Sequence, residues 1–357
     1  MRILQLIDNL QPGGAEKMAV NYANALLSEG FFSGLIVTRS EGKLASLLHP
    51  DVNYFFLNRK SVFDLKALFR FRKYVRKNAI THIHAHGTSF FFATLIKLLS
   101  PAVKIIWHDH NGDRTQQKIS KNRTLKVCSF FFNGILTVNH ALENWSRENL
   151  ECKNVRYIPN FTVKNETEKK ETILKGNEGK RIVCMANLRY PKNHITLLKA
   201  FHETGIAGQG WTVHLVGGDY NDDYSGVLKK FIRDNKLEDS VFIYGSKTDV
   251  FNILSQASIA VLCSTYEGFP VTLLEYGLSE LAVLSSNVGY CPEILDNGKA
   301  GLLFSPLNQK ELADKIVFLT QNNELRTTLG DALKKNIDEN FSESYVLSES
   351  LKFYQEI

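Results

Sequence analysis

The sequence feature that most constrains the fold is a short apolar run that ends in a turn and a helix. Residues 259–262 (Ile-Ala-Val-Leu) are apolar and partly β-branched, which predicts a buried strand. The next segment contains Gly268 and Pro270, and a helical pattern follows over residues 271–281. A strand that leads through a tight turn into a helix is the repeating unit of α/β proteins. We therefore predict an α/β fold.

The turn in this unit has the chemistry of an anion site. Free N–H groups and the positive end of the helix dipole gather at a helix N-terminus, which suits a phosphate. The residues around this helix start are Gly268, Phe269, Pro270 and Val271. Two carboxylates bracket them, Glu267 and Glu275, and a carboxylate accepts hydrogen bonds from two vicinal hydroxyls of a sugar. The alternative is an ordinary strand–turn–helix with two solvated glutamates.

The stretch from Glu267 to Glu275 resembles the E-x7-E signature of retaining nucleotide-sugar glycosyltransferases of the glycogen-synthase-like group, family four. Gly-Phe-Pro stands between the two glutamates, as in that family, and the resemblance runs through nearly the whole chain. It implies the GT-B fold, in which two Rossmann-like domains face each other across a cleft and a C-terminal helix crosses back to the first domain. It also implies that Glu275 holds the ribose hydroxyls and Glu267 the donor sugar.

Length and composition agree with two α/β domains. A chain of 357 residues is too long for one ordinary domain, and 44% hydrophobic residues are enough for two cores. No apolar segment approaches the 18 or so residues of a spanning helix. The start (Met-Arg-Ile-Leu-Gln-Leu-Ile-Asp) is better interpreted as a first strand than as a signal peptide. Five cysteines without metal-like spacing predict reduced thiols in the cytoplasm.

The polar segment 162–180 predicts an interdomain linker. We therefore expect a first domain over residues 1–165 that binds the acceptor. A second domain over residues 166–340 is expected to bind the nucleotide sugar, and a final helix over residues 341–357 to pack back on the first. Charge differs between the halves: residues 1–165 carry 23 Lys+Arg against 11 Asp+Glu, and the remainder 20 against 26. A basic first half indicates contact with an anionic surface or ligand.

Two basic and aromatic segments stand out in the first half. Residues 61–78 predict an amphipathic helix with six Lys/Arg, which suits the surface of a membrane that contains anionic lipid. A second patch precedes Phe130–Phe132 and contains Lys118, Lys121, Arg123 and Lys126. The alternative is a solvated helix face that covers a sheet. Nucleic acid is disfavoured as a partner, because no binding motif accompanies the charge.

Glycines and histidines mark further strand ends in the first half. Gly13 and Gly14 follow a first strand at 3–7 and allow close approach of a ligand at the start of a helix. The resemblance implies that they lie near the donor phosphates and the acceptor. Alternation places His82, His84 and His86 on one face of a strand, which could indicate a metal. We expect none, because no nearby carboxylate or cysteine completes a site and the family needs no metal or other cofactor for its chemistry.

His108 and His110 follow another strand, at the edge where open α/β sheets bind ligands. In the family a histidine of this loop lies beside the donor sugar and its anomeric carbon. Both residues compete for that position, with a preference for His108, which directly ends the strand. The alternative is a polar loop that faces solvent.

Two cations follow the first strand of the second half. Lys192 and Arg189 lie in a strand-to-helix loop, where positive charge can neutralise a diphosphate and ease its departure. This loop resembles the Gly-Arg-x4-Lys segment of the family, except that Ala186-Asn187 replaces Gly-Arg, so Arg189 substitutes from two positions later or Lys192 acts with less help. A later turn at Gly245 resembles the family's contact with the nucleotide base.

These features predict a retaining hexosyltransferase that moves sugar from a nucleotide diphosphate sugar to a hydroxyl. A UDP-sugar is favoured as donor and GDP-mannose is the second choice. The charge and family habit predict a saccharide or lipid-linked acceptor of surface polysaccharide synthesis, at the inner face of the cell membrane. The alternative enzyme class is a UDP-sugar 2-epimerase of the same architecture, against which the E-x7-E block argues. A non-catalytic sugar-binding protein is a third class, disfavoured without a signal peptide.

Overall fold

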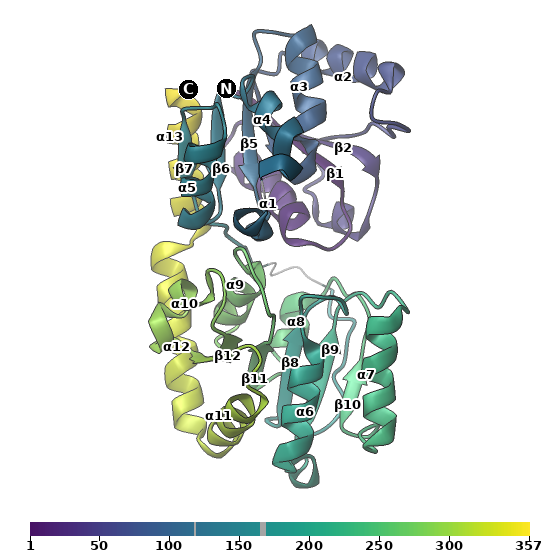
Figure 1. Cartoon of the computed structure of the whole chain (residues 1–357), viewed down its shortest axis with the longest axis vertical. Coiled ribbons are helices and arrows are strands. Elements are labelled where there is room, and N and C mark those ends of the chain that lie inside the picture. The colour runs from purple at the N-terminus through teal and green to yellow at the C-terminus, as the bar shows by residue number, and fades with distance from the viewer. Residues whose placement is uncertain (118, 165–168) are drawn as a thin grey trace. The chain divides into compact units, whose positions relative to one another are not determined.

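The computed structural model describes residues 1–117, 119–164 and 169–357, with two compact α/β units (Figure 1). Unit 1 comprises Met1–Thr162 and Glu343–Ile357, and unit 2 comprises Val163–Ser342. The prediction of two Rossmann-like α/β domains is confirmed. Lys118 of the second basic patch and residues 165–168 of the expected linker lie outside the described residues.

Unit 1 contains a seven-stranded parallel sheet in the order β3-β2-β1-β4-β5-β6-β7. One apolar core joins the sheet to α2, α3 and α4, and a second joins it to α1, which α13 also contacts. The elements are β1 (Arg2–Asn9), α1 (Gly14–Ser28), β2 (Phe32–Ser40), β3 (Asn53–Phe56), α2 (Leu65–Lys77), β4 (His82–His86), α3 (Phe90–Leu99), β5 (Lys104–Asp109), α4 (Arg123–Ser129), β6 (Gly134–Thr137), α5 (His140–Asn149), β7 (Val155–Tyr157) and α13 (Glu343–Glu356).

Unit 2 contains a six-stranded parallel sheet in the order β10-β9-β8-β11-β12-β13. Its main core gathers apolar side chains from the sheet, α6, α7 and α11, while α9 packs on α12 and α8. The elements are β8 (Arg181–Met185), α6 (His194–Thr204), β9 (Thr212–Val216), α7 (Asp223–Asp234), β10 (Val241–Ile243), α8 (Val250–Leu254), β11 (Ile259–Leu262), α9 (Val271–Leu278), β12 (Ala282–Ser286), α10 (Cys291–Ile294), β13 (Leu302–Phe304), α11 (Gln309–Gln321) and α12 (Asn323–Asn340).

The basic helix is shorter than the predicted span of residues 61–78. It begins at Leu65, because the carboxylate of Asp64 accepts a hydrogen bond from the amide of Ala67 at 3.0 Å and so caps the first turn. The helix after β11 likewise ends at Leu278 rather than at residue 281. None of the helices in the described ranges combines the length and the hydropathy that a membrane span requires.

The C-terminal helix α13, yellow in Figure 1, belongs to unit 1. Its side chains Tyr354 and Phe353 are buried, and a side-chain atom added at Gly134 of β6 would come within 2.6 Å of the Phe353 ring. Tyr22 of α1 lies 2.9 Å from the hydroxyl of Ser350. The helix is therefore part of the core of unit 1.

Candidate active site

In unit 2 the loops that follow β8 and β11 are hydrogen bonded to each other. These two strands are neighbours in a parallel sheet, so their carboxyl ends lie at the same edge. The amide of Thr265 donates to the carbonyl of Pro191 at 2.8 Å, and the thiol of Cys263 donates to the carbonyl of Lys192 at 3.2 Å. The peptide bond between Tyr190 and Pro191 is cis. The two loops form one backbone platform at this edge.

Two of the predicted site residues meet on this platform. The ammonium of Lys192 donates to a carboxylate oxygen of Glu267 at 2.6 Å, and the hydroxyl of Ser264 donates to the same oxygen at 2.6 Å. The Glu267 side chain is 10% exposed and the Lys192 side chain 24% exposed. Partial burial strengthens such a charge-assisted pair relative to a surface pair. The sequence assigns Lys192 to the diphosphate of a donor and Glu267 to its sugar, and it does not predict that the two side chains contact each other. Their ion pair is therefore new information from the structure.

Gly289 explains why the Glu267 loop has a defined position. Its φ is +54°, and a Cβ at this position would lie 1.9 Å from the carbonyl oxygen of Glu267. Only glycine lets the two backbone segments approach so closely. The turn after β12, which contains Gly289, therefore supports the loop that carries the carboxylate.

Helix α9 begins directly after this loop. Pro270 occupies the N-cap position and makes no side-chain cap hydrogen bond, so the first amides of α9 lack the usual side-chain acceptor. Phe269 is buried and its ring stacks on Tyr290 with 5.3 Å between ring centroids. Val271 is buried in the first turn, and Glu275, further along the same helix, is 7% exposed. Gly268 connects Glu267 to this start.

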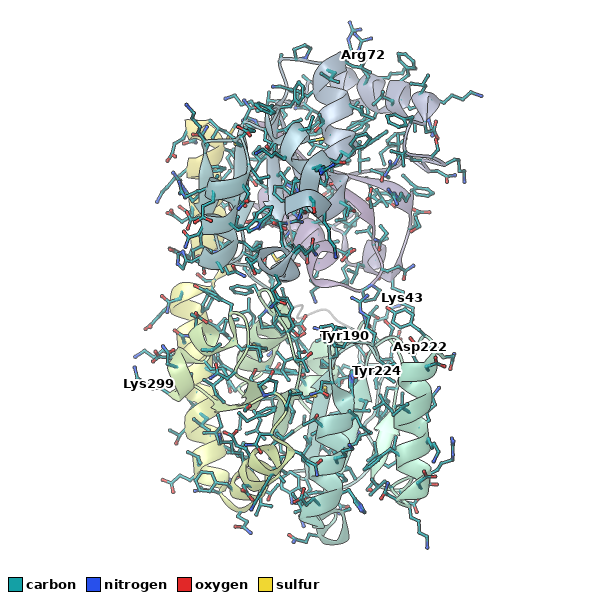
Figure 2. All side chains as sticks on the ribbon, viewed as in Figure 1. Lys43, Arg72, Tyr190, Asp222, Tyr224 and Lys299 are labelled. Carbon is teal, nitrogen blue, oxygen red and sulfur yellow. The ribbon has the colours of Figure 1, made fainter. Side chains whose placement is uncertain are left out.

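The remaining predicted residues of unit 2 line the same sheet edge. Arg189 is exposed in the loop after β8, next to Tyr190, which is 76% exposed and labelled in Figure 2. Gly217, after β9, has no room for a Cβ beside the carbonyl of Ala186, and its amide donates to the carbonyl of Gly245. Gly245 has a φ of +68° and open space on its Cβ side.

In unit 1, Gly13 is the N-cap of α1 and Gly14 its first residue. A Cβ at Gly13 would lie 2.3 Å from the carboxylate of Glu16, which accepts a hydrogen bond from the Asn9 side chain at 3.2 Å. Nothing lies within 4 Å of the Cβ position of Gly14. Gly14 thus leaves open space at the start of the helix.

The histidines of β4 and those at the end of β5 form one cluster, in which His84, His86 and His108 are buried and His110 is half-buried. His84 and His86 lie on one face of β4, as the alternation predicts. His84 Nε2 lies 3.1 Å from His108 Nδ1, and His86 Nδ1 lies 3.0 Å from His110 Nε2. The rings of His108 and His110 are 4.0 Å apart between centroids. The structure therefore places both candidate histidines side by side at the carboxyl end of β5.

Burial keeps these imidazoles neutral. It lowers the pKa of His110 to about 3 and, helped by neighbouring histidines, lowers the pKa values of His84, His86 and His108 well below their usual range. Among the described residues, His84, His86 and His108 form a group that could hold a metal ion, because each brings one nitrogen within 4.8 Å of the others. Those of His84 and His108 lie 3.1 Å apart, between rings that are nearly parallel.

Sequence reasoning missed two ionic centres that shape the strand ends of unit 1. Asp8, at the end of β1, accepts hydrogen bonds from Thr88 at 2.7 Å and from Arg59 at 3.1 Å. Asp109, buried at the end of β5, pairs with Arg114, which opposes the rise that burial causes in the pKa of this carboxyl. A sequence signal was present, since Asp8 directly follows a predicted strand and Asp109 lies in the polar loop after another. The partners of both acids, however, are set by the tertiary fold.

Comparison with known proteins identifies the class of this fold. Residues 12–163 match the family "Glycosyltransferase Family 4", and residues 165–336 match the family "Glycosyl transferases group 1". The solved structure of HepE from Anabaena in complex with UDP and glucose covers all of this chain and of that chain with a TM-score of 0.83 at 16% identity. The fold is that of the GT-B glycosyltransferases.

Two curated relatives are similar in sequence. The N-acetyl-alpha-D-glucosaminyl L-malate synthase of Bacillus anthracis is 23% identical over 78% of this chain and 74% of its own length. The poly(ribitol-phosphate) alpha-N-acetylglucosaminyltransferase of Staphylococcus aureus (strain COL) is 26% identical over 69% of this chain and 49% of its own length. With both halves matched, the chain belongs to the glycosyltransferases of family 4.

The buried neutral histidines predict a stability that falls in acid. In the unfolded chain a histidine has a pKa near 6.5, and the pKa of folded His110 is about 3. Below pH 6.5 the unfolded state therefore binds protons that the folded state does not, so the free energy of unfolding decreases as the pH falls from 6.5 toward 4. His110→Gln should lessen this loss by about 1 kcal/mol per pH unit in that range. Urea midpoints at pH 7.5, 6.5 and 5.5 measure it.

His49→Gln is the control for this experiment, because that imidazole is 54% exposed. Its urea midpoints should follow those of the unchanged protein at every pH. An acid profile of His110→Gln as steep as that of the unchanged protein would contradict the prediction.

Proposed function

We propose that this glycosyltransferase retains the anomeric configuration and moves a sugar from a nucleotide diphosphate sugar, with a UDP-sugar as first choice. The acceptor is a hydroxyl of a saccharide or lipid-linked saccharide of surface polysaccharide synthesis. The observation that carries this proposal is the Lys192–Glu267 pair at the start of α9. It combines a cation, a carboxylate that can accept from sugar hydroxyls, and helix amides that suit a phosphate.

The proposed roles combine this geometry with the family resemblance. Lys192 sits 2.6 Å from a carboxylate, so its ammonium is held in place before any ligand arrives. It neutralises the departing diphosphate together with Arg189 and the first amides of α9, where charge develops in the transition state. Glu267 accepts hydrogen bonds from the donor sugar, and Glu275 from the ribose. For unit 1, the sugar-contacting roles of the Gly14 backbone and of His108 or His110 are proposed from the family resemblance.

The reaction needs no covalent enzyme intermediate. The bond between the anomeric carbon and the β-phosphate oxygen breaks, and its electron pair stays on that oxygen. The acceptor hydroxyl oxygen bonds to the anomeric carbon on the same face, and its proton passes to the departing phosphate oxygen. The task of the protein is to hold the reactants together and to stabilise negative charge on the leaving group.

Similar proteins support the choice of ligands. HepE has been solved in complex with UDP-glucose, and a mutant of TarM from Staphylococcus aureus has been solved in complex with Fondaparinux, alpha-GlcNAc-glycerol and UDP. A sequence relative from Campylobacter jejuni is named as an N-acetylgalactosaminyltransferase that acts on a diphospho-undecaprenol sugar, and one from Erwinia amylovora is an amylovoran biosynthesis glycosyltransferase. These names favour a UDP-sugar and a polysaccharide or lipid-linked acceptor.

The proposal is tested by incubating the protein with UDP-, GDP- and ADP-sugars, in each case with and without simple saccharide acceptors. One nucleotide sugar should raise the melting temperature, because a ligand that binds only the folded state stabilises it. NMR of the product should show the same anomeric configuration as the donor. An inverted product would refute retention, and epimerised UDP-sugar without acceptor would assign the alternative 2-epimerase activity.

Replacing Lys192 should impair the chemical step. Lys192→Ala should lower kcat/KM by about 10²- to 10³-fold, because a charge-stabilising donor contributes roughly 3–4 kcal/mol to the transition state. Lys199→Ala is the matched control, since this lysine is exposed on α6 in the same segment. Steady-state rates with the donor found above measure both variants. Equal kcat/KM for the two variants would remove Lys192 from the proposed role.

We further propose that unit 1 docks on the anionic surface of the inner face of the cell membrane. The segment from Leu65 to His108 contains eight Lys/Arg and no Asp or Glu. The six cations of α2 form no ion pair within the described part of the chain. Arg72, labelled on α2 in Figure 2, instead donates to the carbonyl of Leu99 in α3. Unpaired positive charge of this density favours anionic headgroups.

Exposed aromatic side chains accompany this charge. Phe63, Phe69 and Phe130 are 69%, 57% and 67% exposed, and they belong to the α2 and α4 regions, which both contact α3. Basic residues with apolar side chains on one helical layer are the composition of a surface that lies at a membrane interface. The helices α2, α3 and α4 are therefore the proposed docking face.

The docking face predicts a selective loss of vesicle binding. Phe69→Ser combined with Phe130→Ser should weaken binding to phosphatidylglycerol–phosphatidylcholine vesicles by about tenfold, because two rings no longer insert among the lipids. The control combines Phe318→Ser with Tyr220→Ser, two residues of unit 2 with 52% and 55% exposure. Co-sedimentation at low and high salt measures binding. Equal binding of both double variants, or equal binding to vesicles of phosphatidylcholine alone, would refute the docking face.

A further inference from the structure

Two chains of hydrogen bonds run through the core of unit 1. One ends at His108, in β5, and the other at His110, directly after that strand. The first starts on the C-terminal helix: the hydroxyl of Tyr354 lies 2.8 Å from His84 Nδ1, and His84 Nε2 lies 3.1 Å from His108 Nδ1. It ends at His108 Nε2, which is buried and has no hydrogen-bond partner among the described residues. Tyr354 and His84 are 270 residues apart in sequence.

The direction of this first chain follows from the single hydroxyl proton of Tyr354. The residue is fully buried, and burial raises its pKa well above the usual value, so the hydroxyl keeps its proton. The hydroxyl forms a hydrogen bond with His84, and a buried O–H group without an acceptor is costly. Tyr354 therefore donates to Nδ1 of His84. A neutral imidazole has one N–H and one acceptor nitrogen, so each ring in turn donates from Nε2.

The second chain starts at Gln5 of β1. The carbonyl oxygen of its side chain lies 2.8 Å from His86 Nε2, and His86 Nδ1 lies 3.0 Å from His110 Nε2. An amide carbonyl only accepts, so His86 donates from Nε2 and accepts at Nδ1. His110 then donates from Nε2. Its Nδ1, also buried and without a partner in the described ranges, remains an acceptor.

We propose that Tyr354 and Gln5 are positioning residues that fix the tautomers of His108 and His110 in opposite senses. His108 then presents an N–H and His110 a lone pair, on rings 4.0 Å apart at the carboxyl end of β5. A hydroxyl is both donor and acceptor, so an N–H and a lone pair on neighbouring rings are the complementary groups for one hydroxyl of a sugar. The assignment of that hydroxyl to the donor or acceptor sugar rests on the proposed function, whereas the tautomers themselves are a property of the protein without ligand.

A buried hydroxyl in this region does not have to contact a histidine. Tyr22, from α1, fills the same region, and its hydroxyl is satisfied by Ser350 of α13 at 2.9 Å without entering either chain. Helix α13 thus contributes two buried hydroxyls, those of Ser350 and Tyr354, and only the hydroxyl of Tyr354 contacts one of these histidines. Ser350 is therefore a matched control for Tyr354.

Nitrogen-15 NMR of protein labelled at histidine tests the proposal, because protonated and unprotonated ring nitrogens have different shifts. In the unchanged protein Nε2 of His108 should be protonated and Nδ1 of His110 unprotonated. Tyr354→Phe removes the donor that fixes the first chain, so the His108 Nε2 signal should move toward the unprotonated position while His110 keeps its signals. Gln5→Met should shift the His110 Nδ1 signal and leave the His108 signals in place. Ser350→Ala should leave the signals of both histidines unchanged. The signals are assigned with His108→Gln and His110→Gln.

A His110 protonated at Nδ1, a His108 unprotonated at Nε2, or tautomers that Tyr354→Phe leaves unchanged would overturn the proposal. With the nucleotide sugar that the protein uses, Tyr354→Phe should also lower kcat/KM by about tenfold, as for loss of one aligned hydrogen bond, and Ser350→Ala should leave it within about twofold. Absence of sugar transfer by the unchanged protein would refute the proposed function instead, and the NMR result would still decide the tautomers.

Discussion

Parallel pairing of every strand in both sheets is the constraint from which the rest of this structure follows. Parallel neighbours end at the same edge, so each loop that leaves a strand meets the loops of the adjacent strands. In unit 2 this brings Lys192, after β8, onto Glu267, after β11, although 75 residues separate them. In unit 1 the same rule places the ends of β4 and β5 together, and with them His86 and His110.

The local chemistry of these edges was readable from the sequence. Gly268 and Pro270 mark the turn into α9, and the apolar run before them is strand β11, because short-range turn and strand preferences determine both. The period-two pattern of β4 likewise places its histidines on one face. The bounds of helices were less accurate. The predicted helix starts at residue 61, whereas α2 starts four residues later, at Leu65, because Asp64 caps it there.

The contacts that define the candidate site were not readable in this way. Whether a lysine faces a phosphate or a carboxylate depends on which strands are neighbours, and sheet order is not encoded in any local stretch. The Lys192–Glu267 pair and the contacts of Asp8 both depend on strand order in this way. Gly289 is the clearest case, since its need for a bare backbone arises from the carbonyl of Glu267, which lies 22 residues earlier in the chain. The histidine tautomers depend on an even more distant residue, Tyr354.

The position of α13 has a consequence for how the protein is made. Unit 1 takes its first 162 residues from the beginning of the chain and its last helix from after unit 2. A ribosome therefore completes unit 2 while the core of unit 1 still lacks Phe353 and Tyr354, and the buried face that these rings later cover stays open during that time. Domains generally fold as they emerge, so here the order of synthesis and the order of completion differ. The earlier unit is finished last.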